Sequence, residues 1–571
     1  MRTTHLTHAI YSWLCTMEDS KKSDENEDKT DEREAMAVQS YAALSIGLTC
    51  LLVGVPIWWK TTEVYRVPLP YSEISALGDL TVMSTVNYEV VTFVEDDILS
   101  ELSNLIETYS TKCVDDDEKL KSRYVGRVSR GSEEEQRLLK TAESVEETEI
   151  QLQLLRSPLY HGSYTVFIVP DDCRIVADGS AVIGTFRSAF VSYSQDVKET
   201  FKQITDILQY IFVNDDSVQR VVKTAVGNSS LQADKDSMRS FGSSPRYEVT
   251  FTLINPQPDV LSVTWDVQSA ADKYLRNLLT TLSEFTNITV KSQFLHYVGL
   301  GVQPRKTNVG SRLDRDQLPH IINPIEAYLG SHVSTNPNIN FVVYIPTHDQ
   351  SPLFIHDESG QASSTNAFLS PRWGGLLVYN VNVTADVTPK QTVSIDMRQV
   401  ISVFASQLRL LLGIHSAPQK LKLKVVEPGG RIVSDWELDQ WLRERCIENM
   451  FTSASTLHSL GELLDKIGNI VINDDIAAEV VLAVESIEHG RQLLADGQLR
   501  EAFLVSRQAR DASEKAFFDP SLLELLYFPE DQKFAIYIPL FLPVGIPIIL
   551  SLISAIRWLR GSKQQQKTKT E

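Results

Sequence analysis

One short acidic run is the part of this sequence that most resembles a catalytic motif. Asp115, Asp116 and Asp117 match the Asp-x-Asp pattern with which many glycosyltransferases hold a divalent cation and a sugar nucleotide. The triplet also opens a charged stretch that runs to Lys121, and such a stretch is typical of a solvated loop. The triplet therefore leaves a glycosyltransferase-like enzyme open as an alternative function.

Other catalytic signatures are absent from residues 60–533 of the sequence. This stretch has no Gly-x-Ser-x-Gly elbow, no His-Glu-x-x-His helix, no paired Cys-x-x-Cys signature and no phosphate-binding Gly-x-x-x-x-Gly-Lys-Ser/Thr loop. Residues 356–358 (HDE) could supply metal ligands, but three consecutive polar residues favour a solvated loop. The cysteines Cys113, Cys173 and Cys446 stand in no recognisable cysteine-protease context and can form at most one disulfide. The sequence therefore predicts no catalytic, cofactor-binding or metal-binding residue.

The composition excludes several classes of protein. The chain has 571 residues, a net charge of −20 and 43% hydrophobic residues, which rules out collagen, a disordered low-complexity chain and a small disulfide scaffold. The acidic balance argues against a nucleic-acid partner, because phosphate contacts need basic patches. The mean hydropathy of −0.12 is typical of a soluble protein, but this average hides two apolar segments near the ends of the chain.

These two segments predict two transmembrane helices. Residues 41–59 and 534–556 contain 19 and 23 residues without a charge, and at about 1.5 Å per residue each is long enough to cross a membrane. Aromatic residues flank them, as the membrane interface favours: Trp58, Trp59, Tyr537 and Trp558. The first segment lies behind a long charged stretch, so it is interpreted as an uncleaved anchor rather than a signal peptide.

The second segment has a patterned backbone. Pro539, Pro543 and Pro547 recur every four residues, a spacing that keeps them on one face of a helix. Each proline removes one helical hydrogen bond and frees the carbonyl four residues earlier, which needs a packing partner or water inside a membrane. The pattern fits either a tolerated kink or a bent helix shaped to pack against neighbouring spans or lipid.

Basic residues beside the spans predict their orientation. Five of them follow residue 556, against a single acid: Arg557, Arg560, Lys563, Lys567 and Lys569. The positive-inside rule places the C-terminus in the cytosol, two crossings place the N-terminus there as well, and residues 60–533 then lie in the lumen. Lys567 and Lys569, fifth and third from the end, resemble the dilysine signal that retrieves membrane proteins to the endoplasmic reticulum.

The lumenal stretch contains three glycosylation sequons. Asn228, Asn287 and Asn382 each begin an Asn-x-Ser/Thr triplet. Their number carries no argument, because about three would arise by chance in a stretch of this length. Their lumenal placement makes all three usable as acceptors.

Strand and helix patterns alternate through most of the lumenal stretch. The clearest unit reads strand–helix–strand and implies a parallel strand pair with a right-handed crossover; its parts are residues 247–253, 265–285 and 288–298. Residues 133–155 predict an exposed amphipathic helix. After Gly430 the strand signal stops, and three helices are indicated over residues 436–467, 476–494 and 497–516.

The predicted fold class is therefore an α/β domain, with a mixed sheet and flanking helices, followed by a membrane-proximal helical module. The predicted parts are a disordered cytosolic tail (1–40), a first span (41–59), the lumenal α/β domain (60–430), the lumenal helical module (431–533), a second span (534–556) and a basic cytosolic tail (557–571).

Several longer strings resemble one known family, the PIG-S subunit of glycosylphosphatidylinositol (GPI) transamidase. The resemblance starts in the first span and runs nearly to the end of the chain. The most specific strings are residues 58–63 (WWKTTE), 69–72 (LPYS), 318–324 (LPHIINP), 370–375 (SPRWGG), 518–521 (FDPS), 527–529 (YFP) and 531–533 (DQK). Because they occur in this order between two spans at the expected ends, the chain is identified as a member of this family.

The resemblance implies a non-catalytic subunit of an endoplasmic-reticulum complex. That complex removes a C-terminal signal from a precursor protein and joins the new carboxyl end to the ethanolamine of GPI. In this family the nucleophilic Cys and its His belong to the cysteine-protease-like subunit PIG-K, and the other partners are PIG-T, PIG-U and a metallopeptidase-like subunit. No catalytic motif or cofactor transfers to this chain. The sequons at Asn287 and Asn382 fall at or near positions where family members carry one.

The sequence departs from the family at its N-terminus. Some relatives have basic residues directly before the first span, where they could contact acidic lipid headgroups, whereas residues 35–41 carry no charge here. No headgroup site is therefore transferred to this chain, although lipid surrounds both predicted spans. The alternative function, a membrane-tethered lumenal glycosyltransferase-like enzyme, rests on Asp115 and Asp117.

Overall fold

The computed structural model describes two compact units of the chain. It covers residues 35–567 except for 36, 40, 43, 63–64, 94–95, 112, 115–118, 157–158, 171–172, 178–179, 194–195, 226–238, 309, 331–333, 335, 358, 383–389, 419–422, 468–469 and 525–529. The larger unit comprises residues 69–463 and 478–517. The smaller unit comprises residues 1–68, 464–477 and 518–571.

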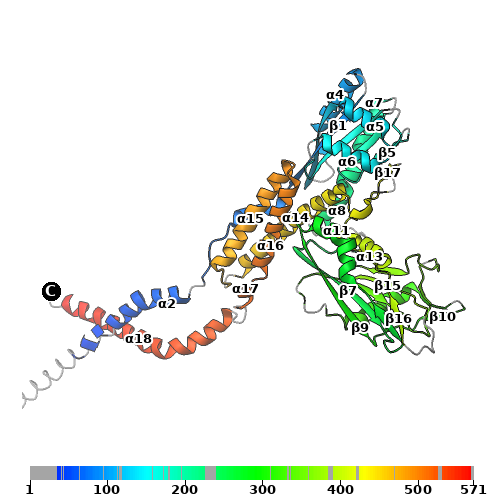
Figure 1. Cartoon of the computed structure of the whole chain (residues 1–571). Helices are drawn as coiled ribbons and strands as arrows, with labels where there is room; N and C mark the ends of the chain where they lie inside the picture. The colour runs from blue at the N-terminus through cyan, green and yellow to red at the C-terminus, as the bar shows by residue number, and fades with distance from the viewer. Residues whose placement is uncertain are drawn as a thin grey trace, which may run out of the picture. The chain divides into compact units, whose positions relative to one another are not determined.

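The larger unit contains a seven-stranded mixed sheet, here called the first sheet, which carries the label β1 in Figure 1. Its strand order is β17-β5-β6-β4-β1-β3-β2. β1 pairs in parallel with β3 and β4, while the β2–β3 and β5–β6 pairs are antiparallel. The bounds are β1 (Val82–Thr92), β2 (Cys113–Val114), β3 (Leu120–Arg130), β4 (Ser163–Val169), β5 (Ala181–Ile183), β6 (Ser188–Ser192) and β17 (Leu423–Val425).

Alternating side chains along β1 fill a core on each face of the first sheet. Val86, Tyr88 and Val90 share a core with α4 (Asp96–Ser110), α7 (Val197–Asp206) and the π-helix η3 (Ile207–Val213). Val91 points to the opposite face and shares a core with α5 (Glu133–Thr141) and α6 (Val145–Leu155). The first sheet is therefore the middle layer between two layers of helices.

A second sheet of five strands also belongs to the larger unit. Its order is β14-β15-β12-β7-β9, and all its pairs are parallel except β14–β15. Helix α12 (Leu318–Glu326) packs on one face, while Phe404 of α13 (Met397–Leu412) stacks on Phe341 at 4.7 Å on the other. The bounds are β7 (Arg246–Asn255), β9 (Asn287–His296), β12 (Asn338–Tyr344), β14 (Ala367–Ser370) and β15 (Gly374–Val378).

Shorter elements complete the described chain. Two small sheets contain β10 (Arg305–Thr307), β11 (Gly310–Leu313) and β13 (Leu353–Ile355), and β8 (Leu261–Thr264) with β16 (Gln391–Ser394). The short helices are η1 (Cys50–Gly54), α2 (Val55–Thr62), α3 (Tyr71–Ala76), η2 (Leu77–Asp79), α8 (Asp215–Ala225), α10 (Val267–Ala270), η4 (Ala271–Leu275), α11 (Arg276–Leu282), η5 (Arg315–Gln317), η7 (Gly429–Arg431) and α17 (Pro520–Glu524).

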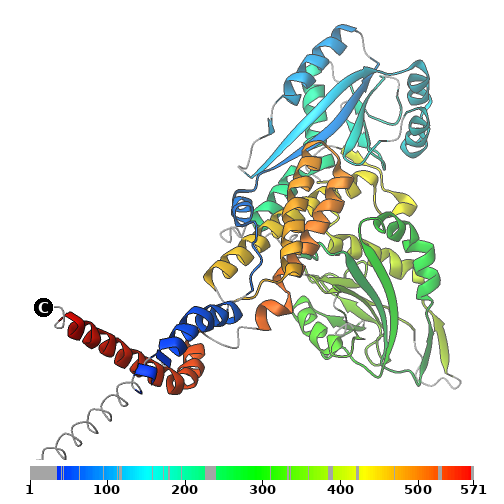
Figure 2. The same cartoon turned by 90° about the vertical axis from the view of Figure 1, so that its left-hand side faces the viewer.

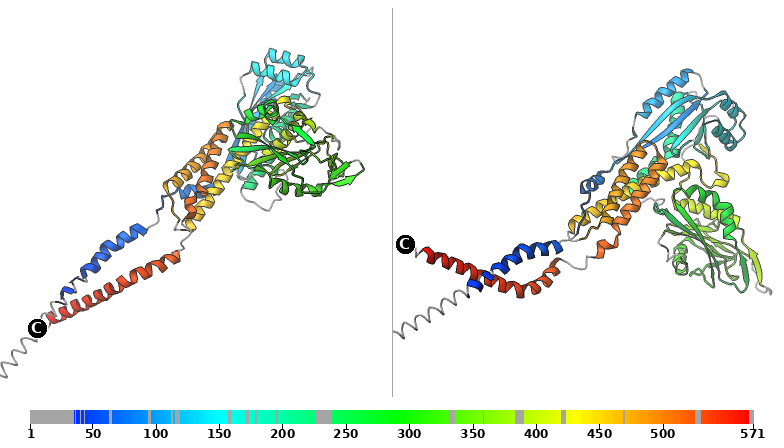
Figure 3. Two further views of the ribbon diagram at one scale, coloured as in Figure 1. Left: turned by 60° about the horizontal axis from the view of Figure 1, so that its bottom comes forward. Right: turned by 60° about the vertical axis from the view of Figure 1, so that its left-hand side comes forward.

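Three long helices follow the second sheet in the chain: α14 (Asp435–Lys466), α15 (Asp474–Ala495) and α16 (Leu499–Phe517). They lie side by side in all views of Figures 1 and 3. The first half of α14 is buried although it is rich in charge, and Asp439 and Arg443 are both 0% exposed. Buried charges need partners. These partners come from loops and a helix beside the two sheets.

The first sheet supplies the partners of Asp439. Arg187 donates two hydrogen bonds to this carboxylate, at 2.6 and 2.9 Å, and the backbone N–H of Gly162 donates a third at 2.9 Å. Nδ1 of His161 lies 2.8 Å from the same carboxylate. Burial alone would raise the pKa of Asp439, but the charge and hydrogen bonds of Arg187, together with His161, hold the pKa below its usual value.

The second sheet is tied to the same helix through the end of α13. Arg409 of α13 pairs with Glu437 of α14, with an Nη2–Oε1 distance of 2.5 Å. The side chains of Trp441 and Arg445 both donate to the carbonyl oxygen of Leu412, at 2.9 and 2.8 Å. Polar groups of α14 therefore bond to the helix and loop layers of both sheets.

The structure confirms a mixed α/β fold with flanking helices and a helical region after residue 430, and it confirms the parallel pairing of β7 with β9. The strands form two main sheets. The sequence does not reveal this division, because the strands that pair are far apart in the chain. The predicted single exposed helix over residues 133–155 is wrong. Ser144 caps a second helix, α6, by accepting the N–H of Glu147, and Leu139 and Leu152 are buried.

We expect Asp439→Asn to lower the free energy of unfolding by about 3 kcal/mol, because it leaves the buried guanidinium of Arg187 with only the partly exposed Asp435, at 3.3 Å, as its counter-charge. Glu488→Gln, which breaks an exposed pair with Arg491, should cost less than about 1 kcal/mol. The measurement is the Tm of the full chain in mild detergent, and equal Tm values for the two variants would contradict the expectation.

The same contact has a defined pH dependence. Because the pKa of Asp439 is lowered in the fold, its stabilisation is present above the unfolded carboxyl pKa of about 3.9 and is lost as the pH falls through the folded-state value.

Candidate functional site

The structure locates part of the residues for which the sequence predicts a role. Asn287 is the first residue of β9 and Asn382 follows β15, and both are exposed. Lys567 is the last residue of α18 (Glu530–Lys567). Other predicted residues lie outside the described part of the chain: Asn228, Lys569 and residues 115–117.

The smaller unit contains two apolar helical stretches. One helix runs from Ala37 to Lys60, with a mean hydropathy of 1.8 over its most apolar 18 residues. The second predicted span lies in α18, where the segments Ala535–Pro543 and Gly545–Arg557 meet at an angle of 49°, a bend visible in Figure 2. By length and composition the described residues contain one helix able to cross a membrane, or two if the bent pair forms a single span.

The first apolar helix packs against α18. Gly47 is buried, and a Cβ at this position would lie 2.5 Å from Cδ1 of Leu552, so the glycine permits a close approach of the two helices. At the other end of the contact, the ring of Trp58 stands edge-on to Tyr537 and Phe541, with centroid distances of 6.0 and 6.2 Å. Figure 3 shows the two helices next to each other in both views.

The three prolines of α18 lie away from this contact. Pro539, Pro543 and Pro547 are all exposed. The bend falls between Pro543 and Gly545, which is where lost helical hydrogen bonds permit a kink. This bend is compatible with both interpretations of the proline pattern, a tolerated kink and a helix shaped to pack against neighbours.

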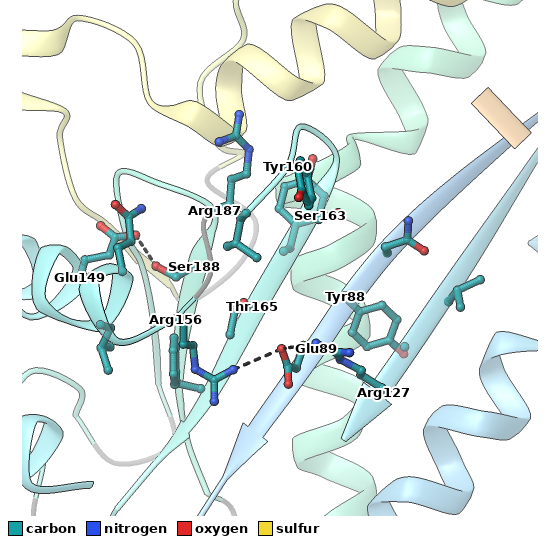
Figure 4. Close-up of a pocket in the computed structure, with 18 residues that line it drawn as sticks. Tyr88, Glu89, Arg127, Glu149, Arg156, Tyr160, Ser163, Thr165, Arg187 and Ser188 are labelled. Carbon is teal, nitrogen blue, oxygen red and sulfur yellow. Dashed lines mark hydrogen bonds and ion pairs between the residues drawn. The ribbon is translucent and has the colours of Figure 1, made fainter. Parts of the chain in front are cut away.

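A pocket of about 590 Å³ opens on the α5–α6 face of the first sheet (Figure 4). Its floor is formed by residues of β1, β3 and β4, and α6 supplies Leu152 and Gln153. On the other side, the end of α15 contacts the sheet, because the hydroxyl of Thr85 donates to the carbonyl of Ala495 at 2.6 Å. The pocket is the part of this sheet face that neither α5–α6 nor the end of α15 covers.

Glu89 of β1 is the central charge of this pocket. It accepts hydrogen bonds from Ser129 at 2.6 Å and Arg127 at 3.1 Å, and it pairs with Arg156 at 3.2 Å. Figure 4 shows Glu89 between the two arginines. Burial alone would raise the pKa of Glu89, but these hydrogen bonds and charges hold it below its usual value. Glu89 therefore stays ionised, and its oxygens are occupied by neighbours.

Glu149 of α6 is the second carboxylate of the pocket. It accepts the backbone N–H groups of Thr185 and Phe186, at 2.8 and 3.0 Å, and the hydroxyl of Ser188. Burial raises the pKa of Glu149 above its usual value, although these hydrogen bonds oppose the shift. Its contacts fix the turn between β5 and β6, so this carboxylate has a structural role.

The pocket lacks the thiol and imidazole groups of a cysteine nucleophile and its base. The residues that line it include neither Cys nor His, and its carboxylates are engaged as described. Elsewhere in the described part of the chain, no three His, Cys, Asp or Glu side chains gather to hold a metal ion. Cys446 of α14 is fully buried, and burial raises the pKa of its thiol to about 12, so it is protonated at neutral pH.

No motif in the sequence marks these pocket residues. Glu89 lies inside a β-prone run, YEVVTFV at residues 88–94, and a charged residue within an apolar strand is the signal that could have found it. Arg127 and Arg156 carry no motif, and they meet Glu89 only because β1, β3 and the end of α6 are neighbours in the fold.

Two mixed sheets, a bundle of long helices and an apolar helix long enough to cross a membrane define a large α/β protein. The chain belongs to the PIG-S family: the family model described as Phosphatidylinositol-glycan biosynthesis class S protein matches residues 45–562.

Relatives from animals and fungi match over nearly the whole chain. The human protein named GPI-anchor transamidase component PIGS is 40% identical over 546 residues, 92% of this chain and 97% of the relative. The Schizosaccharomyces pombe protein named GPI transamidase component PIG-S homolog is 24% identical over 95% of this chain and 89% of the relative. The Saccharomyces cerevisiae GPI transamidase component GPI17 is 22% identical over 91% and 92%.

We expect Gly47→Leu to separate the first apolar helix from α18, because a Cβ at this position overlaps Leu552. Gly54→Leu is the matched control, since a Cβ there meets nothing within 4 Å. The measurement is thiol cross-linking of the full chain between cysteines introduced by Trp58→Cys and Tyr537→Cys, scored as a product that requires both. Equal cross-linking of the two leucine variants would argue against the observed helix contact.

Proposed function

We propose that this chain is a subunit of a GPI transamidase. The observation that carries the proposal is the extent of the match, because the family model spans residues 45–562 and 97% of the human transamidase component is covered. A match of this extent includes both sheets, the helical bundle and α18. The chain therefore shares the architecture of its relatives rather than one module of it.

We infer that the chain has no catalytic role within that complex. The complex would replace the C-terminal signal of precursor proteins with a GPI anchor, using the Cys and His of PIG-K. The burial of Cys446 and its pKa of about 12 support this inference, because a nucleophilic thiol needs a thiolate. The engagement of Glu89 and Glu149 by structural donors supports it as well. No cofactor is needed for such a role.

The proposed membrane arrangement places this subunit in the endoplasmic-reticulum membrane. Residues 41–59 and 534–556 would both cross, residues 60–533 would be lumenal and both termini cytosolic, as the basic residues after the second span favour. Lys567 and Lys569 would then act as a retrieval signal on the cytosolic side. The partners would be PIG-K, PIG-T, PIG-U and the metallopeptidase-like subunit, with the proline face of α18 against partner spans or lipid.

Deletion of the protein in its own cells tests this proposal. We expect uncleaved precursors to accumulate and GPI-anchored proteins to disappear from the cell surface, while GPI lipid is still made, because the defect lies in attachment. Re-expression of the full chain should restore the surface proteins, and a pulldown in mild detergent should recover PIG-K and PIG-T. Normal surface levels after deletion would overturn the proposal.

Glycosylation tests the lumenal placement of the large region. We expect Thr289→Ala to increase gel mobility, because it abolishes the sequon at the exposed Asn287, whereas Thr289→Ser keeps the sequon and should leave mobility unchanged. Thr384→Ala and Asn228→Gln apply the same test to the other sequons. If glycosidase left the mobility of the chain unchanged, none of the three sequons would be occupied.

A further inference from the structure

Within the described part of the chain, strand β9 leaves one edge of the second sheet open. It is the last strand in the order β14-β15-β12-β7-β9, and Figure 1 shows it next to β7 at the margin of that sheet. None of its ten residues is buried, whereas β7 is buried over most of its length. Among the strands that the structure describes, the other outer strands of the two main sheets are short: β14 has four residues, β17 three and β2 two.

Every second residue of β9 turns its backbone away from the sheet. The N–H of Asn287 donates to Pro245 at 3.0 Å and that of Tyr297 donates to Asn255 at 3.2 Å. The register between these two bonds is continuous, so odd-numbered residues face β7. The N–H and C=O groups of the even-numbered residues therefore point outward: Ile288, Val290, Ser292, Phe294 and His296.

β9 lacks the features that usually protect an exposed strand. It contains no proline, and its continuous register with β7 leaves no bulge. Lys291 is the one lysine or arginine of the strand, and it pairs with Glu248 of β7 at 2.5 Å. A long edge without proline, bulge or free charge is a template for pairing with another chain.

Aromatic side chains lie on one sheet face beside this edge. The ring of Trp265 stands edge-on to Phe294 with a centroid distance of 6.2 Å, and its Nε1 donates to the hydroxyl of Ser292 at 3.3 Å. Phe294 is 49% exposed. Exposed aromatic residues are enriched where proteins bind one another.

We propose that a β-strand of another subunit pairs with β9 and becomes the sixth strand of the second sheet. This inference rests on the proposed function, because the partner belongs to the transamidase. The occupant is an extended backbone, since only a strand offers donors and acceptors at the spacing of the five outward residues. Apolar side chains at alternate positions of that strand would pack on Trp265 and Phe294.

A partner subunit fits this edge better than a second copy of the chain. Two copies that each carry a net charge of −20 repel one another. A glycan on Asn287 leaves the aromatic surface open, because the side chain of this first residue lies on the sheet face opposite to Phe294.

Two variants of Ser292 in the full chain separate the backbone contribution from that of the side chain. Ser292→Pro and Ser292→Ala both remove the hydroxyl that accepts from Trp265, but only proline removes the outward N–H, and it leaves the bonds to β7 intact. We expect Ser292→Pro to reduce the partner subunits recovered in a mild-detergent pulldown about five-fold or more, the effect of one lost hydrogen bond. Ser292→Ala should match the wild-type chain.

Hydrogen exchange of the wild-type chain gives a measurement that does not depend on a variant folding. About five amides of residues 288–296 should exchange slowly in the purified complex and rapidly in the isolated chain. Equal exchange in both states, with the transamidase subunits still bound, would overturn this inference alone. Protection in an assembly of two copies without other subunits would also overturn it. A wild-type pulldown without transamidase subunits would overturn the proposed function and this inference together.

Discussion

The buried polar face of α14 is the constraint on which the larger unit depends. Asp439 of this helix has its partners beside the first sheet, whereas Glu437 and Trp441 have theirs at the end of α13 beside the second. A buried ion pair need not add net stability over a well-packed apolar pair, but removing one partner leaves an uncompensated charge. A misplaced sheet would likewise leave a buried charge of α14 without its partner. The network therefore selects one arrangement of the two sheets around one helix.

The helices cover the two sheets unevenly, and this determines which sheet surfaces stay exposed. On the first sheet, α5–α6 and the end of α15 cover different parts of one face, and the pocket around Glu89 lies between them. On the second sheet, α12 and α13 cover the central strands β7 and β12, while β9 projects beyond them without a buried residue. Both open surfaces are polar or amphipathic: donors around Glu89 engage its carboxylate in the first, and Trp265 and Phe294 lie beside the second.

The sequence could predict those elements whose signal is local. The period of apolar residues located the three long helices α14, α15 and α16 within a few residues, and alternation located β7 and β9. The division into two sheets was not predictable, because β17 pairs with β5 across more than two hundred residues. The role of α14 was hidden for the same reason: charged positions such as Asp439 normally indicate a solvated face, and the distant Arg187 is what makes burial tolerable. Sequons are recognised from short motifs and apolar helices from their composition, whereas the pocket and the open edge depend on which strands become neighbours.

The bent helix α18 carries the argument for assembly into the membrane. If it crosses the bilayer as we propose, its three prolines each leave one carbonyl without a helical donor, on Ala535, Pro539 and Pro543. All three of these residues are exposed, and the first apolar helix contacts α18 elsewhere, through Gly47 and Trp58. An unpaired carbonyl costs several kcal/mol in hydrocarbon, on the order of a lost hydrogen bond without water. We infer that partner spans, or water held between them, satisfy these carbonyl groups. A lone two-span anchor would have no use for such a face, whereas a subunit within a bundle of spans would.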